Sequence, residues 1–316
     1  MRSDDAREML FRPKGNAACA PRRGTDPMAD TGALLRAEGL VKRFGDLVAV
    51  GGLDVEARVG EVLGFLGPNG AGKTTSIRMM CGLLAPDAGR VLLGGEPIGT
   101  GISQRRRIGV CPQQIVVWER LTCVEQLTFL GRMYGLTTTD ARRRGLDLLD
   151  RLGLANKASS LARALSGGMQ RRLNIALALV QDPDVVFLDE PEAGLDPQAR
   201  VLVREFIVDL ATTKAVILST HNMDEAERVA TRVAIIDQGR VLRCGPPHEL
   251  ERDVGEAEIL EVDLAGGAAL EWLPPVIAQA LGQPPDGRLW AGEFYPLDVP
   301  EPQPPARPCR LWEIEL

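Results

Sequence analysis

Short apolar runs alternate with longer amphipathic stretches through the middle of the chain. The runs have the length of buried strands, and the stretches between them have helical spacing. One run, Val185–Leu188, is apolar at every position, which indicates burial on both faces of a sheet, as parallel strands have. Strands that alternate with helices predict a parallel α/β sheet. The other predicted strands lie at residues 40–41, 62–66, 90–93, 108–111, 215–218 and 233–236.

Residues 121–164 have a different character, because no strand pattern interrupts them. We interpret this segment as a helical insert in the α/β core, although one more pair of core-covering helices would give the same pattern. Its apolar residues recur at helical spacing: Val124, Leu127, Leu130 and Met133, then Leu146, Leu148, Leu149 and Leu152.

The two ends of the chain lack this order. Residues 1–34 are rich in Arg, Pro, Gly and Asp without any period, so we expect a disordered extension. Met28 is an alternative start. The ordered domain is expected over residues 35–250. In the remaining appendage, 251–316, alternation around 260–264 predicts one strand, and the Pro-rich segment 297–308 is expected to be extended.

Composition excludes several classes of protein. The 316 residues carry a net charge of −6, which gives no support to a general nucleic-acid-binding role. No apolar run approaches the roughly 18 residues that a membrane span needs, so a membrane role is expected to come through a partner. The six cysteines include no C-x-x-C pair and there are two histidines, which argues against a zinc site.

The strand that ends at Leu66 is followed by the spacing G-x-x-x-x-G-K-[ST]. Glycines in such a loop let successive backbone N–H groups surround a phosphate chain, and the next helix presents its positive end to the same anion. Lys73 would reach the β- and γ-phosphates, and the Thr74 hydroxyl would bind Mg²⁺. The stretch comprises Gly67, Pro68, Asn69, Gly70, Ala71, Gly72, Lys73, Thr74 and Thr75.

Four further polar residues follow predicted strands. Asp189 and Glu190 end the strand that starts near Val185, Gln113 follows the strand at 108–111, and His221 follows the strand at 215–218. Ligands of parallel sheets bind at the carboxyl ends of the strands, so these side chains can converge with the glycine-rich loop. Asp189 would hold Mg²⁺ and Glu190 would polarise a water molecule. Taken alone, Gln113 and His221 are better explained as loop residues.

Two other features allow two interpretations each. Phe44 could stack on an adenine ring or belong to the core. The stretch Ser166-Gly167-Gly168 begins a helix and could meet a phosphate or form an ordinary helix cap.

In their order along the chain, these motifs resemble those of ATP-binding cassette (ABC) ATPases, the nucleotide-binding subunits of transporters. The likeness covers residues 36–250, and the signature Leu165–Gln170 separates it from other P-loop proteins. It implies a P-loop core with a parallel sheet, an antiparallel β-subdomain and the helical insert. Gln170, Leu121-Thr122 and the segment 220–227 are similar to the multidrug (daunorubicin-type, ABC-2) export branch.

The resemblance also implies roles. Phe44 would stack on adenine, and the backbone of Gly70–Thr74 would hold the phosphates with Lys73. Thr74, Gln113 and Asp189 would bind Mg²⁺, Glu190 would be the general base, and His221 would contact the γ-phosphate. Ser166, Gly167 and Gly168 would serve ATP bound to a second copy in a head-to-tail dimer. A separate multi-span permease is the implied partner, at the cytoplasmic face of the cell membrane.

The chain departs from this pattern at Glu192, where the family usually has Thr or Ser, at Phe44, where Tyr is commoner, and in its C-terminal tail. Two other functions compete. Non-transport ABC ATPases of translation or DNA repair usually carry two cassettes or a long coiled coil, and this chain has neither. A degenerate binding module would lack Lys73 or Glu190, and both are present.

Overall fold

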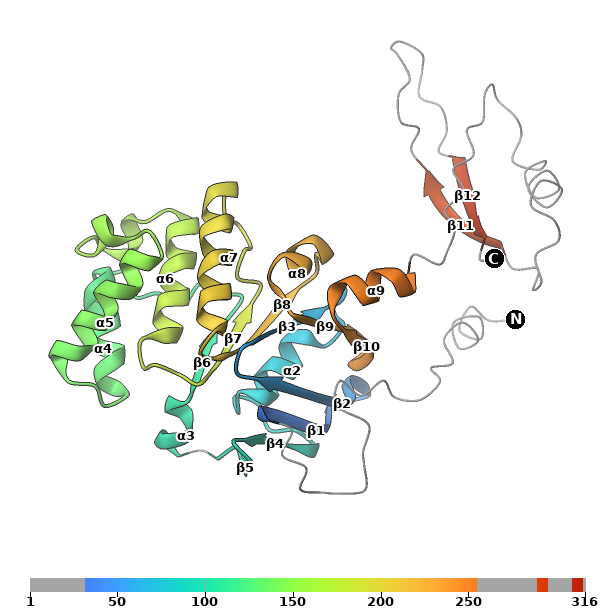
Figure 1. The fold of residues 1–316 in the computed structure, drawn as a ribbon, viewed down its shortest axis with the longest axis horizontal. Coiled ribbons are helices and arrows are strands. Elements are labelled where there is room, and N and C mark those ends of the chain that lie inside the picture. The colour runs from blue at the N-terminus through green and yellow to red at the C-terminus, as the bar shows by residue number, and fades with distance from the viewer. Residues whose placement is uncertain (1–31, 100, 255–288, 295–308, 315–316) are drawn as a thin grey trace, which may run out of the picture. The chain divides into compact units, whose positions relative to one another are not determined.

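The computed structural model describes residues 32–99, 101–254, 289–294 and 309–314. The chain divides into two compact units, Met1–Leu250 and Glu251–Leu316, which we describe separately. The first unit carries nearly all of the described residues and contains two sheets (Figure 1).

The larger sheet of the first unit has the strand order β10-β9-β3-β8-β7-β6. Strands β9, β3, β8, β7 and β6 run parallel, and β10 pairs antiparallel with β9. The bounds are β3 Glu61–Leu66, β6 Ile108–Cys111, β7 Val185–Asp189, β8 Ala215–Thr220, β9 Arg232–Asp237 and β10 Arg240–Gly245. The predicted parallel α/β sheet is therefore confirmed.

The smaller sheet is antiparallel, with the order β2-β1-β4-β5. Its first strand begins at Ala33, two residues before the expected start of the ordered domain. The difference has a physical reason, because Leu34 packs on the core and its carbonyl oxygen accepts a hydrogen bond from the N–H of Gly94 at 2.7 Å. The bounds are β1 Ala33–Phe44, β2 Leu47–Arg58, β4 Ala88–Leu93 and β5 Glu96–Pro97.

Successive residues of the central strands face two different hydrophobic cores. On β7, Val185 and Phe187 belong to the core that includes helix α2 (Lys73–Met80) and the antiparallel sheet, whereas Val186 and Leu188 belong to the core on the other face. This period of two is the strand geometry itself, with apolar residues on both sides. Helix α2 thus lies between the two sheets and is buried with them (Figure 1).

The other face of the larger sheet is covered by helices. Within the range of the expected helical insert, α4 begins with a capping box in which Thr122 and Glu125 bond each other's backbone N–H, and Thr137 caps α5. The remaining bounds are α3 Ile102–Arg106, α4 Cys123–Met133, α5 Thr138–Arg151, α6 Gly167–Leu179, α7 Pro197–Ala211, α8 Met223–Val229 and α9 Pro247–Val254, with 3₁₀ turns at Ala155–Lys157 and Ala162–Ala164.

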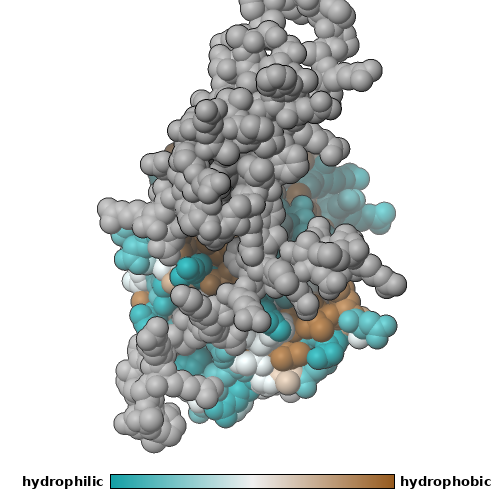
Figure 2. All heavy atoms as spheres, turned by 90° about the vertical axis from the view of Figure 1, so that its right-hand side faces the viewer, coloured by the Kyte–Doolittle hydropathy of each residue, from teal (hydrophilic) through white to brown (hydrophobic). Residues whose placement is uncertain are grey.

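In the second unit the structure describes one antiparallel pair, β11 (Leu289–Phe294) with β12 (Cys309–Ile314). The expected strand at 260–264, the Pro-rich segment 297–308 and the N-terminal residues 1–31 lie outside the described residues. None of the helices in the described part of the chain has the length and apolar character to cross a membrane. On the face drawn in Figure 2, hydrophilic and hydrophobic residues are interspersed over the visible part of the first unit.

Candidate functional site

The loop between β3 and α2 passes so close to other backbone that two positions require glycine. A Cβ atom at Gly67 would lie 2.1 Å from the carbonyl oxygen of Ile236, and one at Gly72 would lie 2.4 Å from that of Ala49. Gly72 also has a φ of 95°, which side chains disfavour. The backbone at Ile236 and Ala49 therefore fixes the position of the loop and of the N-terminal end of α2. This end of a helix favours anions.

Lys73, the first residue of α2, directs its ammonium group back onto this loop. Its Nζ donates to the carbonyl oxygens of Gly67 at 2.6 Å and of Pro68 at 3.0 Å. Burial lowers the pKa of Lys73, and the nearby carboxylates of Glu190 and Asp189 act in the opposite direction. A partly desolvated cation beside a glycine-rich backbone is suited to bind phosphate.

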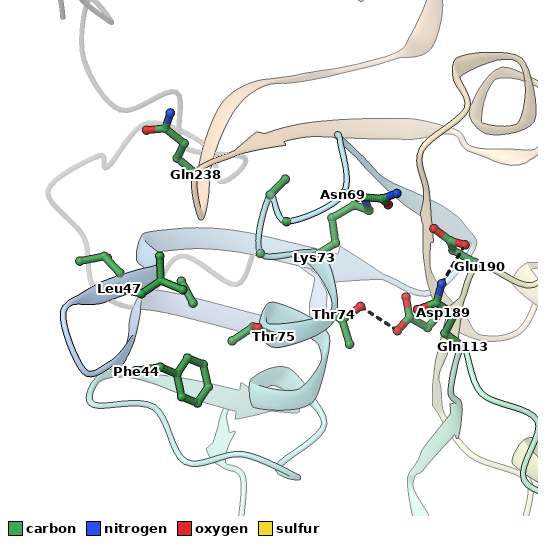
Figure 3. A pocket seen from close by; sticks show the side chains of 15 residues that line it. Phe44, Leu47, Asn69, Lys73, Thr74, Thr75, Gln113, Asp189, Glu190 and Gln238 are labelled. Atoms are coloured by element: carbon green, nitrogen blue, oxygen red, sulfur yellow. Dashed lines mark hydrogen bonds between the residues drawn. The ribbon is translucent and has the colours of Figure 1, made fainter. Parts of the chain in front are cut away.

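Asp189 ends strand β7 and is 5% exposed. Its Oδ2 accepts a hydrogen bond from the Thr74 hydroxyl at 3.0 Å (Figure 3). Its Oδ1 accepts another from the hydroxyl of Ser219, which lies beside it on the parallel strand β8. The carboxyl ends of β7 and β8 therefore meet the start of α2, as the sheet topology predicts.

Glu190 has a left-handed backbone, with a φ of 49°. This conformation is uncommon for a side chain and is held because the N–H of Glu190 donates to both the carbonyl and the hydroxyl oxygen of Ser219 at 3.2 Å. Its carboxylate lies between two side chains from other loops. The Gln113 Nε2 donates to Oε2 at 3.2 Å, and the His221 Nδ1 is 3.0 Å from Oε1.

These groups surround a cavity of about 690 Å³. One end is apolar, where the half-exposed ring of Phe44 lies with Leu47, and the other end carries the carboxylates of Asp189 and Glu190 (Figure 3). Such a cavity suits a ligand with a flat ring at one end and charged groups at the other. It is lined by Phe44, Leu47, Val48, Ala49, Asn69, Gly70, Ala71, Gly72, Lys73, Thr74, Thr75, Gln113, Asp189, Glu190 and Gln238.

The remaining candidate residues fall into two groups. Gly67, Pro68 and His221 do not line the cavity but bond to Lys73 or Glu190, which do. Ser166, Gly167 and Gly168 are not among the lining residues; the Ser166 Oγ caps α6 by accepting the N–H of Met169 at 3.3 Å. Within one chain, the signature residues and the cavity are thus separate.

Sequence reasoning missed two residues that hold this site together. Ser219 could have been found, because it ends the strand next to that of Asp189. Arg171 is buried and donates to four backbone carbonyl oxygens around the cavity. No local signal distinguishes it from the adjacent Arg172.

The residues at the polar end fit a magnesium ion. Thr74 and Asp189 offer hydroxyl and carboxylate oxygens 3.0 Å apart, and the amide oxygen of Gln113 is a third hard donor at the same end of the cavity. Within the described ranges there is no group of three or more His, Cys, Asp or Glu residues that could hold a metal alone. This agrees with the way proteins hold Mg²⁺, through few side chains together with substrate phosphates.

Comparison with known proteins identifies the family. The ABC transporter family model matches residues 50–193. The chain is 46% identical over 231 residues to the Nod factor export ATP-binding protein I of Ralstonia nicotianae, covering 72% of each protein. The chain belongs to the ATP-binding subunits of ABC transporters. It is also 38% identical over 235 residues to the linearmycin resistance ATP-binding protein LnrL of Bacillus subtilis, covering 74% of this chain and 76% of the relative.

Solved structures agree with this assignment. An ATP-binding subunit of an ABC transporter superimposes with a TM-score of 0.65 at 30% identity, covering 70% of this chain and 93% of that one. The subunit cbiO1 of Clostridium perfringens, part of the transporter complex cbiONQ, gives 0.63 at 28% identity, with 71% and 92% covered. The predicted ABC ATPase fold and family are confirmed. As an ABC ATPase, the chain binds and hydrolyses ATP as a subunit of a transporter.

Proposed function

We propose that ATP hydrolysis by this chain powers the export of a substrate through a separate multi-span permease. The observation that carries the proposal is the carboxylate of Glu190, held beside Gln113 and His221 at the polar end of a cavity that also contains Lys73. The names of the two relatives above, one of export and one of resistance, support the direction of transport. The chain would act peripherally at the cytoplasmic face of the cell membrane.

ATP would enter with its adenine on Phe44 and its phosphates on the loop Gly67–Thr75. The apolar surroundings of Phe44 favour stacking of a base, and Lys73 supplies a cation at the start of α2. Thr74, Gln113 and Asp189 would hold Mg²⁺, which neutralises phosphate charge when it is bound.

Hydrolysis needs a base that faces the γ-phosphate. Glu190 is the proposed base, since its carboxylate lies at the polar end of the cavity and would take a proton from the attacking water. His221 would hold the γ-phosphate and the orientation of that carboxylate, to which its Nδ1 is 3.0 Å away. Gln113 would hold the orientation of the carboxylate from the opposite loop, since its Nε2 is 3.2 Å from the other oxygen.

A second copy of the chain would complete the site. Because Ser166, Gly167 and Gly168 start helix α6 but are not among the residues that line the cavity, we propose that they contact ATP bound to a partner in a head-to-tail dimer. ATP would then join two copies, and its hydrolysis would separate them.

The permease would bind the helical insert. Exposed apolar side chains occur on α4 of the insert and in the segment that precedes it, and the rings of Trp118 and Phe129 pack edge to face with centroids 5.7 Å apart. We call this set the insert patch. Exposed apolar clusters of this kind mark interaction sites. It comprises Ile115, Val116, Trp118, Phe129 and Met133.

The catalytic proposal is tested with Glu190→Gln. The variant should bind ATP as the wild type does and lose nearly all turnover, because an amide cannot accept the proton. Binding is measured by titration calorimetry and turnover by phosphate release, with the exposed Glu205→Gln on α7 as the matched control. Phosphate release at the wild-type rate from Glu190→Gln would refute the role of Glu190.

The partner proposal is tested by mild-detergent purification of the tagged protein. A multi-span membrane protein should copurify with the wild type, and Phe129→Glu should abolish its recovery because it places a charge in the insert patch. Val208→Glu on α7 is the control, since Val208 is 49% exposed and Phe129 51%. Equal recovery with both variants would refute the insert patch.

The division of the chain follows from this function. We propose that residues 33–250 form the ATPase domain, with the N-terminal extension and the segment 251–316 as appendages to it. The alternative, an ABC ATPase of translation or DNA repair, has no support, because the relatives and the solved structures named above are transporter subunits.

A further inference from the structure

Arg171 is the largest of the fully buried side chains in the described part of the chain, with 2% exposure. It lies on α6, five residues after Ser166, and its guanidinium bonds the backbone beside three residues that line the cavity, Gln113, Asp189 and Glu190. One nitrogen, Nη1, donates to the carbonyl oxygens of Pro112 at 2.9 Å and Gln113 at 2.6 Å. The other, Nη2, donates to those of Asp189 at 2.7 Å and Glu190.

These four carbonyls belong to two separate segments, the loop after β6 and the end of β7 with the turn that follows it. One segment carries Gln113 and the other carries Glu190, and the Nε2 of Gln113 lies 3.2 Å from the Glu190 carboxylate (Figure 3). A planar fork with donors on two nitrogens can span both segments, which a lysine ammonium on a single point cannot. The pairing of β6 with β7 ends at Cys111 and Leu188, and beyond that pair Arg171 bridges the two backbones.

A second residue of α6 strengthens the link to the same loop. Asn174 is buried, its Nδ2 lies 3.4 Å from the carbonyl oxygens of Pro112 and Gln114, and its Oδ1 accepts the N–H of Val116 at 3.2 Å. Helix α6 thus holds the chain from Pro112 to Val116 along its length, while Arg171 alone of these two also holds the end of β7.

No ion pair of Arg171 occurs among the residues that the structure describes. Four backbone carbonyl oxygens accept hydrogen bonds from its Nη1 and Nη2, and its buried Nε has no hydrogen-bond partner there. Burying a cation in this way is costly unless its donors are satisfied. A chain that needed only a filled space here would be served by an apolar side chain. The arrangement instead has the geometry of a spacer between two polar segments.

We propose that Arg171 is a positioning residue for ATP hydrolysis, which fixes Glu190 against Gln113 and ties both to the helix that begins with the signature residues. This rests on the proposed role of Glu190 as the base. Because α6 starts at Gly167, a displacement of the signature end of the helix would be passed through Arg171 to the base and to Gln113 together.

The test compares Arg171→Lys with Arg172→Lys in the full chain. Arg172 is a matched control, since it is the next residue on α6 and also donates to backbone carbonyls, those of Leu152 at 2.8 Å and Gly153 at 3.4 Å, away from the cavity. Arg171→Lys should lower kcat about 100-fold, the effect of a displacement of about 1 Å, with little change in KM. Arg172→Lys should stay within about twofold of the wild type, as substitutions away from a functional feature do.

A purely structural role is separated by a double variant. If Arg171 acts through Glu190, then Arg171→Lys should lower the residual rate of Glu190→Gln by far less than it lowers that of the wild type. Arg171→Gln is made in parallel, because its neutral amide avoids burial of the lysine ammonium, which could itself prevent folding. Wild-type kcat in a folded Arg171 variant, or multiplicative effects with Glu190→Gln, would overturn the proposal. Normal turnover by Glu190→Gln itself would instead refute the base.

Discussion

The ion pair of Glu192 with Arg204 joins a buried carboxylate to a partly exposed guanidinium, so the structure predicts how much each partner contributes to stability. Glu192 is 3% exposed and accepts three hydrogen bonds from Arg204 on α7, at 2.8, 2.9 and 2.6 Å. The pair raises the pKa of Arg204, chiefly through these hydrogen bonds. It joins the turn that follows Glu190 to the body of α7.

The two partners differ in exposure, which predicts unequal effects. Breaking a buried pair costs about 3–5 kcal/mol, because one charge remains buried without a partner. Glu192→Ala leaves Arg204 unpaired, but the side chain of Arg204 is 16% exposed and can regain water. The loss of stability in this variant should therefore be about 3 kcal/mol, the lower end of the range. Arg204→Ala leaves the buried carboxylate, so its cost should be near the upper end, about 5 kcal/mol.

Replacing both partners should restore stability. In the double variant Glu192→Thr with Arg204→Leu no buried charge is left, and such replacements are often neutral or stabilising. The free energy of unfolding is measured in urea for the wild type, both single variants and the double variant. At a slope of about 3 kcal/mol per M, Glu192→Ala should move the midpoint by about 1 M.

Two results would refute this reasoning. Equal losses in the single variants would show that the difference in exposure does not matter. A double variant less stable than either single one would show that the pair itself, rather than the uncompensated charge, supplies the stability.

Three further predictions concern the site. Burial lowers the pKa of Lys73 below 10.5, whereas a bound phosphate favours the charged form. At alkaline pH below 10.5, ATP binding should therefore take up a fraction of a proton, and it should weaken as the pH rises further. Calorimetry in two buffers of different ionisation enthalpy measures the uptake, and Lys73→Arg should show none. Phe44→Ala should weaken ATP binding by about 1–3 kcal/mol through lost stacking, with Phe44→Tyr close to the wild type, as binding titrations would reveal. Gly239→Ala should lower the Tm more than Gly45→Ala, because both have positive φ but only a Cβ at Gly239 would meet backbone, 2.4 Å from the Ala49 oxygen.

Local pattern predicted the central strands and the position of the site. The run Val185–Leu188 is apolar throughout, and its two faces fill two cores. Once the strands were parallel, the residues after them had to meet at one edge, which is why Gln113, Asp189 and Glu190 line one cavity.

Strand β2 was not predicted as a strand, because its own sequence is ambiguous. Gly51 and Gly52 interrupt its pattern, and Gly52 has a φ of 101°, which is foreign to a regular strand. The strand forms because it pairs with β1 over most of its length, from Arg58 with Ala33 to Leu47 with Phe44. Pairing between distant residues leaves no signal in local periodicity, and the contacts of Arg171 could not be predicted from the sequence for the same reason.

The groups that we assign to ATP already have partners inside the protein. Lys73 bonds the carbonyl oxygens of its own loop, Thr74 bonds Asp189, and both oxygens of Glu190 are taken by Gln113 and His221. Binding of ATP is therefore an exchange of hydrogen bonds, and its net free energy is far smaller than the sum of the new contacts. Glu190 differs from the other groups, because each of its oxygens has a second lone pair and can accept a proton from water while Gln113 and His221 still hold the carboxylate. Since Arg171 holds the backbones of Gln113 and Glu190 together, a change in the orientation of this carboxylate against Gln113 must come from the two side chains or from a movement of α6 itself.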